Sequence, residues 1–297
     1  MEDSRNIIKA IDALTLKAGG EVVDSKNITE AIDNLCTTFT DRVMITYTVG
    51  SEGCDFSSLT ESIKYAYTVG NCVLRLAPEV FDITSETDIS AEGNGLPIGN
   101  NIHIIGNKGT IIRCNYTGSD GAVQKAFSVF NAYPSDFIIE NVRIEARNVK
   151  YCVHDDCNGT TSAYIHKYIN CEMYHDSSEA LWRTPQCIGG GFGSNAYCEV
   201  FGGIYESVPV HYSLTENIGG PYSEDVLNCP ISWHQNTRNV NAMNTMSIRN
   251  CYLVGENSHI AYGTGPNGNV FLSGNSWSKA PRSYYTSNLY AWNNELR

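Results

Sequence analysis

Histidine and aspartate stand side by side after two runs of alternating apolar residues. The residues are His154, Asp155, Asp156, His175 and Asp176. Imidazole and carboxylate groups placed together can exchange protons, hold a metal or hydrogen-bond a polar ligand. Because equivalent residues on neighbouring strands lie about 4.8 Å apart, we expect these five to line one edge of a stacked β structure. His211 and His234 follow later runs and can extend that edge.

Two other interpretations of the same residues stay open. Aspartate in a solvated turn commonly accepts hydrogen bonds from the backbone and does nothing more. Paired carboxylates can also hydrolyse polysaccharide at separations of roughly 5 to 9.5 Å, and Asp155, Asp156, Asp176 and Glu179 offer such pairs. The chain has no lyase motif and no paired-aspartate signature of a pectin methylesterase. We therefore assign no catalytic residue and interpret the edge as a binding surface.

Trp182 and Arg183 follow shortly after Asp176, and we predict that they bind glycan together with His154, Asp155, Asp156, His175 and Asp176. Aromatic residues are dense from Tyr151 to Trp233. A flat ring can stack on a pyranose while asparagine, aspartate and histidine bind its hydroxyls. The same rings suit subunit interfaces, which are enriched in tyrosine and tryptophan.

Metal and cofactor sites are not predicted. The eleven cysteines extend from Cys36 to Cys251 without a Cys-x-x-Cys pattern, and Cys152 and Cys157 are separated by acidic residues. The N-terminus, MEDSRNIIKAID, lacks the basic and apolar regions of a secretory signal. We expect synthesis in a reducing cytosol, with reduced thiols serving as small core residues.

Composition excludes two classes of partner. With 20 basic and 32 acidic residues the formal charge is −12, which does not suit nucleic acid. No apolar run approaches the roughly 20 residues that span a bilayer, so membrane insertion is not expected. Abundant glycine (26) and tyrosine (18) favour a turn-rich β protein.

The elements that would position these residues begin with two short helices. Residues 5–17 place apolar residues at helical spacing, and the pattern Asn-Ile-x-x-Ala-Ile-Asp-x-Leu occurs at 6–14 and again at 27–35. Helices this short need a partner for their apolar stripe. That partner is either another chain or the body of the protein, on which the two helices would form a lid.

Strands are predicted from residue 43 onward. MITYTVGSEG alternates like a strand, DFSSLTESIKYAYTVG predicts a helix capped by Ser57 or Ser58 with Glu61 in its first turn, and CVLRLAPEVFDIT predicts two strands broken at Pro78. Residues 101–115 predict two more strands, joined at a Gly-Asn turn.

Residues 48–63, TVGSEGCDFSSLTESI, and 73–82, VLRLAPEVFD, resemble the opening of the pectin lyase-like superfamily. That superfamily starts its solenoid with a glycine turn, an aromatic residue, a capping helix and a strand ending in a Pro-Gly-x-Tyr-like turn. Here the turn is Pro78-Glu-Val-Phe81. The resemblance covers about residues 45 to 280 and implies a right-handed parallel β-helix; it specifies activity poorly.

Recurring asparagine and glycine support a repeated architecture. The positions are Asn141, Asn170, Gly202, Asn228, Asn250 and Asn275. Such residues tolerate the left-handed conformation of a corner, although Asn228, followed by Pro230, fits least well. Cys171, Cys229 and Cys251 come directly after a corner and are predicted to stack inward. A β-sandwich would instead show two-residue hairpin turns between strands of similar length.

A helical segment ahead of a β-helix also resembles bacteriophage and prophage tailspikes and fibres. That resemblance implies a homotrimeric virion appendage (tail spike, tail fibre or head fibre) that contacts host surface polysaccharide. Residues 1–42 would anchor or oligomerise the chain and join it to other virion proteins, and residues 43–297 would form the β-helix. The alternatives are a polysaccharide hydrolase or lyase of the same fold and a purely structural decoration protein.

Overall fold

The computed structural model describes residues 2–17, 25–27, 30–31, 44–84, 95–115, 128–147, 149, 151–157, 159–176, 186–191, 193–208, 230–234, 243–255, 260–263, 268–277, 282–283 and 288–296. The chain is mostly β, and every pairing between described strands is parallel. The expectation of an all-β chain with parallel sheets is confirmed. An antiparallel hairpin sandwich does not fit the described strands.

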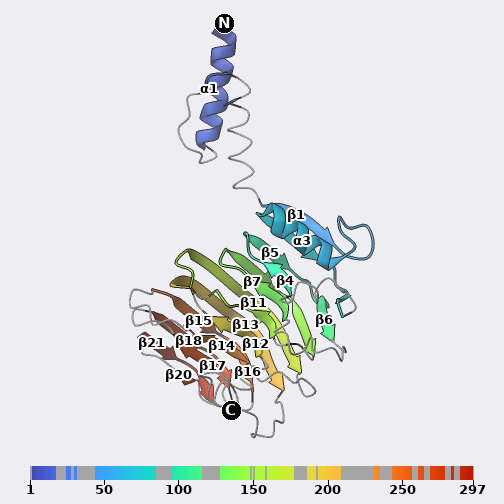
Figure 1. Ribbon diagram of the computed structural model, residues 1–297, viewed down its shortest axis with the longest axis vertical. Coiled ribbons are helices and arrows are strands. Elements are labelled where there is room, and N and C mark those ends of the chain that lie inside the picture. The colour runs from blue at the N-terminus through green and yellow to red at the C-terminus, as the bar shows by residue number, and fades with distance from the viewer. Residues whose placement is uncertain are drawn as a thin grey trace.

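The strands form three rows, two of which merge into one sheet (Figure 1). Row one is β1 (Ile45–Val49), β2 (Cys72–Leu76), β5 (Ile102–Ile105), β8 (Phe137–Glu140), β11 (Ala163–Asp176), β13 (Asn195–Val208), β15 (Thr245–Arg249), β18 (Asn269–Ser273) and β21 (Asn288–Trp292). Row two is β3 (Val80–Asp82), β6 (Ile111–Asn115), β9 (Arg143–Arg147), the second halves of β11 and β13, β16 (Tyr252–Val254), β19 (Ser276–Trp277) and β22 (Glu295–Leu296).

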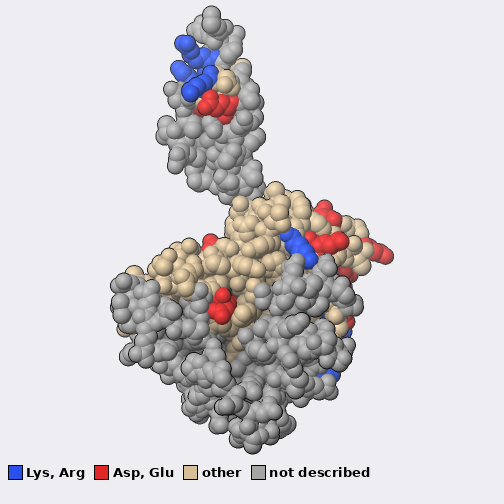
Figure 2. Space-filling model, viewed as in Figure 1, with Lys and Arg blue, Asp and Glu red and all other residues tan. Residues whose placement is uncertain are grey.

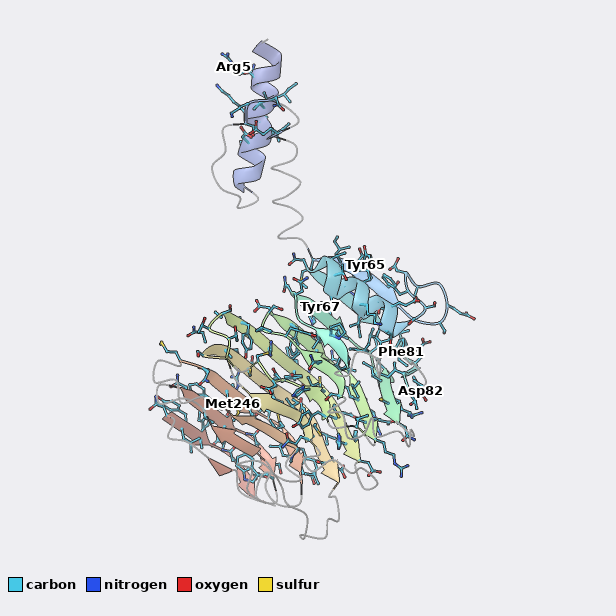
Figure 3. The ribbon with its side chains drawn as sticks, in the orientation of Figure 1. Arg5, Tyr65, Tyr67, Phe81, Asp82 and Met246 are labelled. Carbon is cyan, nitrogen blue, oxygen red and sulfur yellow. The ribbon has the colours of Figure 1, made fainter. Side chains whose placement is uncertain are left out.

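Row three is the separate seven-stranded sheet. It holds β4 (Leu96–Ile98), β7 (Ser128–Ala132), β10 (Tyr151–His154), β12 (Gln186–Gly191), β14 (Ile231–His234), β17 (Ile260–Gly263) and β20 (Arg282–Ser283). From β2 to β20 the chain visits the three rows in the same order each time, so each circuit adds one strand, or one half of β11 or β13, to each row. Ile104, Ile144 and Val153, one from each row, are fully buried in one core. Met246 of β15 (Figure 3) is buried in the same core.

Corners between rows one and two have a repeated design. Left-handed φ values occur at Asn141 (56°), Asn170 (49°), Gly202 (68°), Asn250 (57°) and Gly274 (63°). Four of the six predicted corner positions are thereby confirmed. Asn228 lies outside the described residues. The prediction for Asn275 was wrong: Gly274 makes that corner, and Asn275 is the buried residue after it.

After three of these corners the next residue is Cys171, Cys251 or Asn275, which turns inward and hydrogen-bonds to backbone groups near the bend. The Asn275 amide donates to the Ile248 carbonyl at 2.8 Å, and its side-chain oxygen accepts from the Cys251 backbone N–H at 3.0 Å. The Cys171 thiol donates in the same way to the Ile139 carbonyl at 3.4 Å. Cys171 and Cys251 therefore stack inward as predicted; Cys229 lies outside the described residues. The Cys171 and Cys251 thiols therefore fill space in the core and also donate hydrogen bonds, as the side-chain amide of Asn275 does after its corner.

The two ends of the rows differ. At one end α3 (Leu59–Val69) packs against β2 and β4; it is capped by Ser58, whose hydroxyl accepts from the Glu61 N–H at 3.2 Å, as predicted. At the other end all five residues of β21 are exposed, among them Leu289 at 50% and Trp292 at 49%. The equivalent of Leu289 one circuit earlier, Val270, is fully buried. Apolar residues thus keep their inward register on a strand that no described segment covers.

The N-terminal helix α1 (Glu2–Lys17) matches the first predicted helix and stands apart from the sheets in Figure 1. Of the second predicted helix, the structure describes only the start. There the Asn27 side chain accepts a hydrogen bond from the Glu30 N–H at 2.9 Å, and the Glu30 carboxylate accepts one from the Lys26 N–H at 2.8 Å. The first bond is the N-cap bond of a capping box, whereas the second goes to the residue before the cap. No helix within the described ranges is both long and apolar enough to cross a membrane.

Candidate functional site

The predicted His/Asp edge does not exist as one surface. His154 ends β10 in row three, with Asp155 and Asp156 just after it, whereas His175 and Asp176 end β11 in row two. Asp155 and His175 are each 1% exposed. The His175 ring donates from Nε2 to the Val149 carbonyl at 2.7 Å. The five residues are therefore divided between two rows and between core and surface.

The partly buried His154 and the exposed Asp156 form a small pair at the end of β10 in row three. His154 Nδ1 lies 3.1 Å from Asn131 Oδ1 on the neighbouring strand, and its Nε2 lies 3.8 Å from Asp156 Oδ2. The Tyr151 ring stacks on the imidazole with centroids 5.2 Å apart. These partners hold His154 in one orientation. Trp182, Arg183, Glu179 and His211 lie outside the described residues, as does the side chain of His234.

Asp176 belongs to a pocket of about 300 Å³ on the outer side of row two. Its charged and aromatic lining comprises Arg113, Arg143, Glu145, Arg147, Tyr174 and Glu206, beside Asp176. His175 and the buried residues Cys114 and Ala146 also border it. The pocket spans four consecutive strands, β6, β9, β11 and β13.

Parallel register brings these residues together. Arg113, Glu145, Tyr174 and Glu206 are direct partners on successive strands, so they form one line across the row. Arg147 and Asp176 are partners in the next line, two residues further along. Alternate residues of a strand share a face, so RIEAR in β9 places Arg143, Glu145 and Arg147 outward together.

Ion pairs hold the pocket in shape. Glu145 accepts from Arg113 at 2.9 Å and from Arg143 at 2.7 Å, and Arg147 lies 3.5 Å from Asp176. The Arg143 guanidinium sits 4.4 Å from the centre of the Tyr174 ring. Burial, then the charge of Glu172, raises the pKa of Tyr174, so its hydroxyl remains a neutral donor. Half-exposed ion pairs contribute little stability, about 0 to 1 kcal/mol each, so a ligand can replace them at small cost.

Sequence reasoning missed most of this pocket. Of the predicted site residues, it contains Asp176 and the buried His175. Arg113, Glu145 and Glu206 were not predicted as site residues, and Tyr174 was predicted only as one of many aromatic residues in this region that suit sugar binding or an interface. The alternating charges of RIEAR are a usable signal, but only the inter-strand register shows that they meet Tyr174.

A second cluster lies inside the core, around His166. Its Nδ1 lies 2.8 Å from Asp155 Oδ1, and the Tyr168 hydroxyl donates to Asp155 Oδ2 at 3.0 Å. Metal-ligating atoms of Asp155, Cys157 and His166 all lie within 4.8 Å of one another. Burial, and then the nearby Asp155, raises the pKa of the Cys157 thiol and that of the Tyr168 hydroxyl.

Comparison with protein-family models, with curated proteins and with solved structures finds no match for this chain.

Proposed function

We propose that the three rows form a right-handed parallel β-helix and that the chain is a glycan-binding appendage of a bacteriophage or prophage virion. The constant order in which the chain visits the rows supports the β-helix. The resemblance of residues 48–63 and 73–82 to the pectin lyase-like superfamily also supports the β-helix, and the virion setting rests on the helical N-terminal segment that precedes it.

The observation that carries glycan binding is the row-two pocket. Tyr174 supplies an aromatic surface, with Glu145 and Glu206 as its partners on either side and Arg147 diagonal to it. Carboxylates accept hydrogen bonds from sugar hydroxyls, and guanidinium groups donate to ring oxygens and to acidic substituents. The lining holds three arginines against Glu145, Asp176 and Glu206, so it suits a polar saccharide of low net charge.

Binding to polysaccharide from the host surface tests this proposal. We expect Tyr174→Ala and Arg147→Ala each to weaken binding about tenfold, a loss of about 1.4 kcal/mol. Tyr252→Ala is the matched control, because Tyr252 is 46% exposed on β16 of the same row and does not line the pocket. Equal affinity of all three variants and the unchanged protein would show that the glycan does not bind there.

Polysaccharide hydrolysis is a second candidate, favoured by the carboxylates around Tyr174. Glu145 and Glu206 are two strands apart, which separates their Cα atoms by roughly 9.6 Å. Inverting glycosidases place their two carboxyl groups about 6.5 to 9.5 Å apart. Glu145→Gln and Glu206→Gln should then abolish release of reducing ends from the polysaccharide while binding persists. No release by the unmodified protein from its host's polysaccharide excludes this candidate.

We further propose that the chain is a homotrimer held together, and joined to other virion proteins, by residues 1–42. Support comes from the apolar stripe of α1, in which Ile7 is 48% exposed and is free to contact another chain. Figure 2 shows basic and acidic side chains close together on the surface of α1.

A further inference from the structure

The cluster around His166 joins two rows of the core. Asp155 and Cys157 come from the turn after β10 in row three, and His166 and Cys198 come from β11 and β13 in row one. All four are at most 4% exposed. Four side chains of metal-binding type in a core that is otherwise largely apolar require an explanation.

The hydrogen bonds of His166 define which ring nitrogen faces the cluster. Its Nε2 lies 3.1 Å from the carbonyl oxygens of both Tyr133 and Ser135. Carbonyl oxygens only accept, so Nε2 carries a hydrogen. Nδ1 therefore faces Asp155 Oδ1, at 2.8 Å. A ring nitrogen and a carboxylate oxygen both attract positive charge, so a cation lies between them, either a proton or a metal ion.

The surroundings have the form of an outer coordination shell. Histidine ligands commonly donate their second ring nitrogen to a backbone carbonyl, and ligating carboxylates are themselves hydrogen-bonded. Here Nε2 of His166 meets two carbonyls, and the Tyr168 hydroxyl binds Asp155 Oδ2 at 3.0 Å. The Phe137 ring stacks on the imidazole with centroids 4.1 Å apart, which fixes its plane.

The ligand set matches one class of metal. Atoms of Asp155, Cys157 and His166 lie within 4.8 Å of one another. Cys198, the direct strand partner of His166, is not part of that group, so its thiol moves closer when it becomes the fourth ligand. Tetrahedral zinc with bonds of about 2.0 to 2.3 Å separates its ligands by roughly 3.3 to 3.8 Å. The His166 nitrogen and Asp155 oxygen then move apart by roughly 0.5 Å. Thiolate and imidazole select zinc-type cations over magnesium and calcium.

We propose that Asp155, Cys157, His166 and Cys198 form a buried four-coordinate site for a zinc-type divalent cation. Binding releases three protons, one from each thiol and the one between His166 and Asp155. Four protein ligands leave no open position, so the site is structural. Because it is buried, the metal enters while the chain folds. Once bound, it links rows one and three.

The test uses the full chain produced in cells, first with zinc and then with cobalt replacing zinc in the medium. We expect about one metal per chain, and for cobalt the visible absorption bands of a tetrahedral thiolate site. Cys157→Ser and Cys198→Ser should lose both the metal and these bands. Cys152→Ser is the matched control: Cys152 is equally buried, in row three, and should retain both.

The cobalt spectrum of the unaltered chain keeps the test decisive if a serine variant fails to fold. Purified chain that carries no metal, shows no thiolate–cobalt bands and melts at the same temperature with and without a chelator during expression overturns the proposal. A proton alone would then bridge Asp155 and His166. Glycan binding does not enter either readout, so this result is independent of the proposed function.

Discussion

Tyr205 carries a hydroxyl that is fully buried and has no hydrogen-bond partner among the described residues. Burial raises the pKa of this phenol above its ordinary value of 10.0. The native chain therefore keeps the proton at a pH where the unfolded chain releases it. The contribution of Tyr205 protonation to the free energy of unfolding is therefore fully present below about pH 10 and is lost as the pH rises above that value.

Tyr205→Phe should stabilise the protein at neutral pH by about 1 kcal/mol, because it removes an unsatisfied buried polar group. It should also lessen the fall in stability above about pH 10. Urea unfolding at both pH values measures the two effects. Tyr252→Phe, at an exposed position of row two, should change neither. A loss of stability in Tyr205→Phe at neutral pH would show that the hydroxyl has a partner.

The roles of some individual residues could be predicted from the sequence, and the roles of others could not. Asn141, Asn170 and Asn250 could be predicted as corners, since few other residues adopt a left-handed φ. Asp155 and Asp156 could not be told apart, although one is buried and the other exposed. Consecutive residues alternate between two faces, but the pattern of types does not say which face is inside when both are acidic.

At the scale of the element, the bend within β11 depends on Asn170. Its φ is 49°, and the strand continues on both sides of it, pairing with β8 before the bend and with β9 after it. Asn170→Gly should cost little, because glycine adopts this conformation freely. Asn170→Val should cost about 1 to 2 kcal/mol more. Urea midpoints of the two variants give the comparison.

Ile165, exposed on row one of the same strand, supplies the control substitution Ile165→Val, which should be nearly neutral. Equal destabilisation by glycine and valine at position 170 would mean that the side-chain amide, and not the backbone conformation, determines the bend.

The strands and helices were easier to predict from sequence than the pairing of one strand with another. The strands of residues 45–82 and α3 with its Ser58 cap follow from local residue types. The row-two pocket does not, because it depends on Arg113, Glu145, Tyr174 and Glu206 being in register. Segments of different length separate these strands, and only the three-dimensional pairing brings the four residues into line.

At the scale of the whole molecule, the described residues of the N-terminal segment do not contribute to the buried core of the β rows. The buried core cluster begins at Val49, and no described residue before it belongs to that cluster. Deleting residues 1–42 should therefore leave the melting temperature of the remainder nearly unchanged. Light scattering should show a trimer for the full chain and a smaller species after the deletion.

An unfolded remainder would instead identify the two helices as a lid on the β body. A monomeric full-length chain would contradict the trimer and count heavily against a fibre.

The contrast between the two ends of the rows gives the molecule a direction. α3 closes one end, whereas β21 leaves its backbone edge, with Leu289 still in register, uncovered by any described segment. Each strand lies parallel to the strand before it in the row, so the backbone edge of one strand determines where the next one pairs. The outer edge of β21 pairs with no described strand. We expect another uncharged strand with apolar residues at alternate positions to extend the rows there, lengthening the molecule without altering its inner circuits.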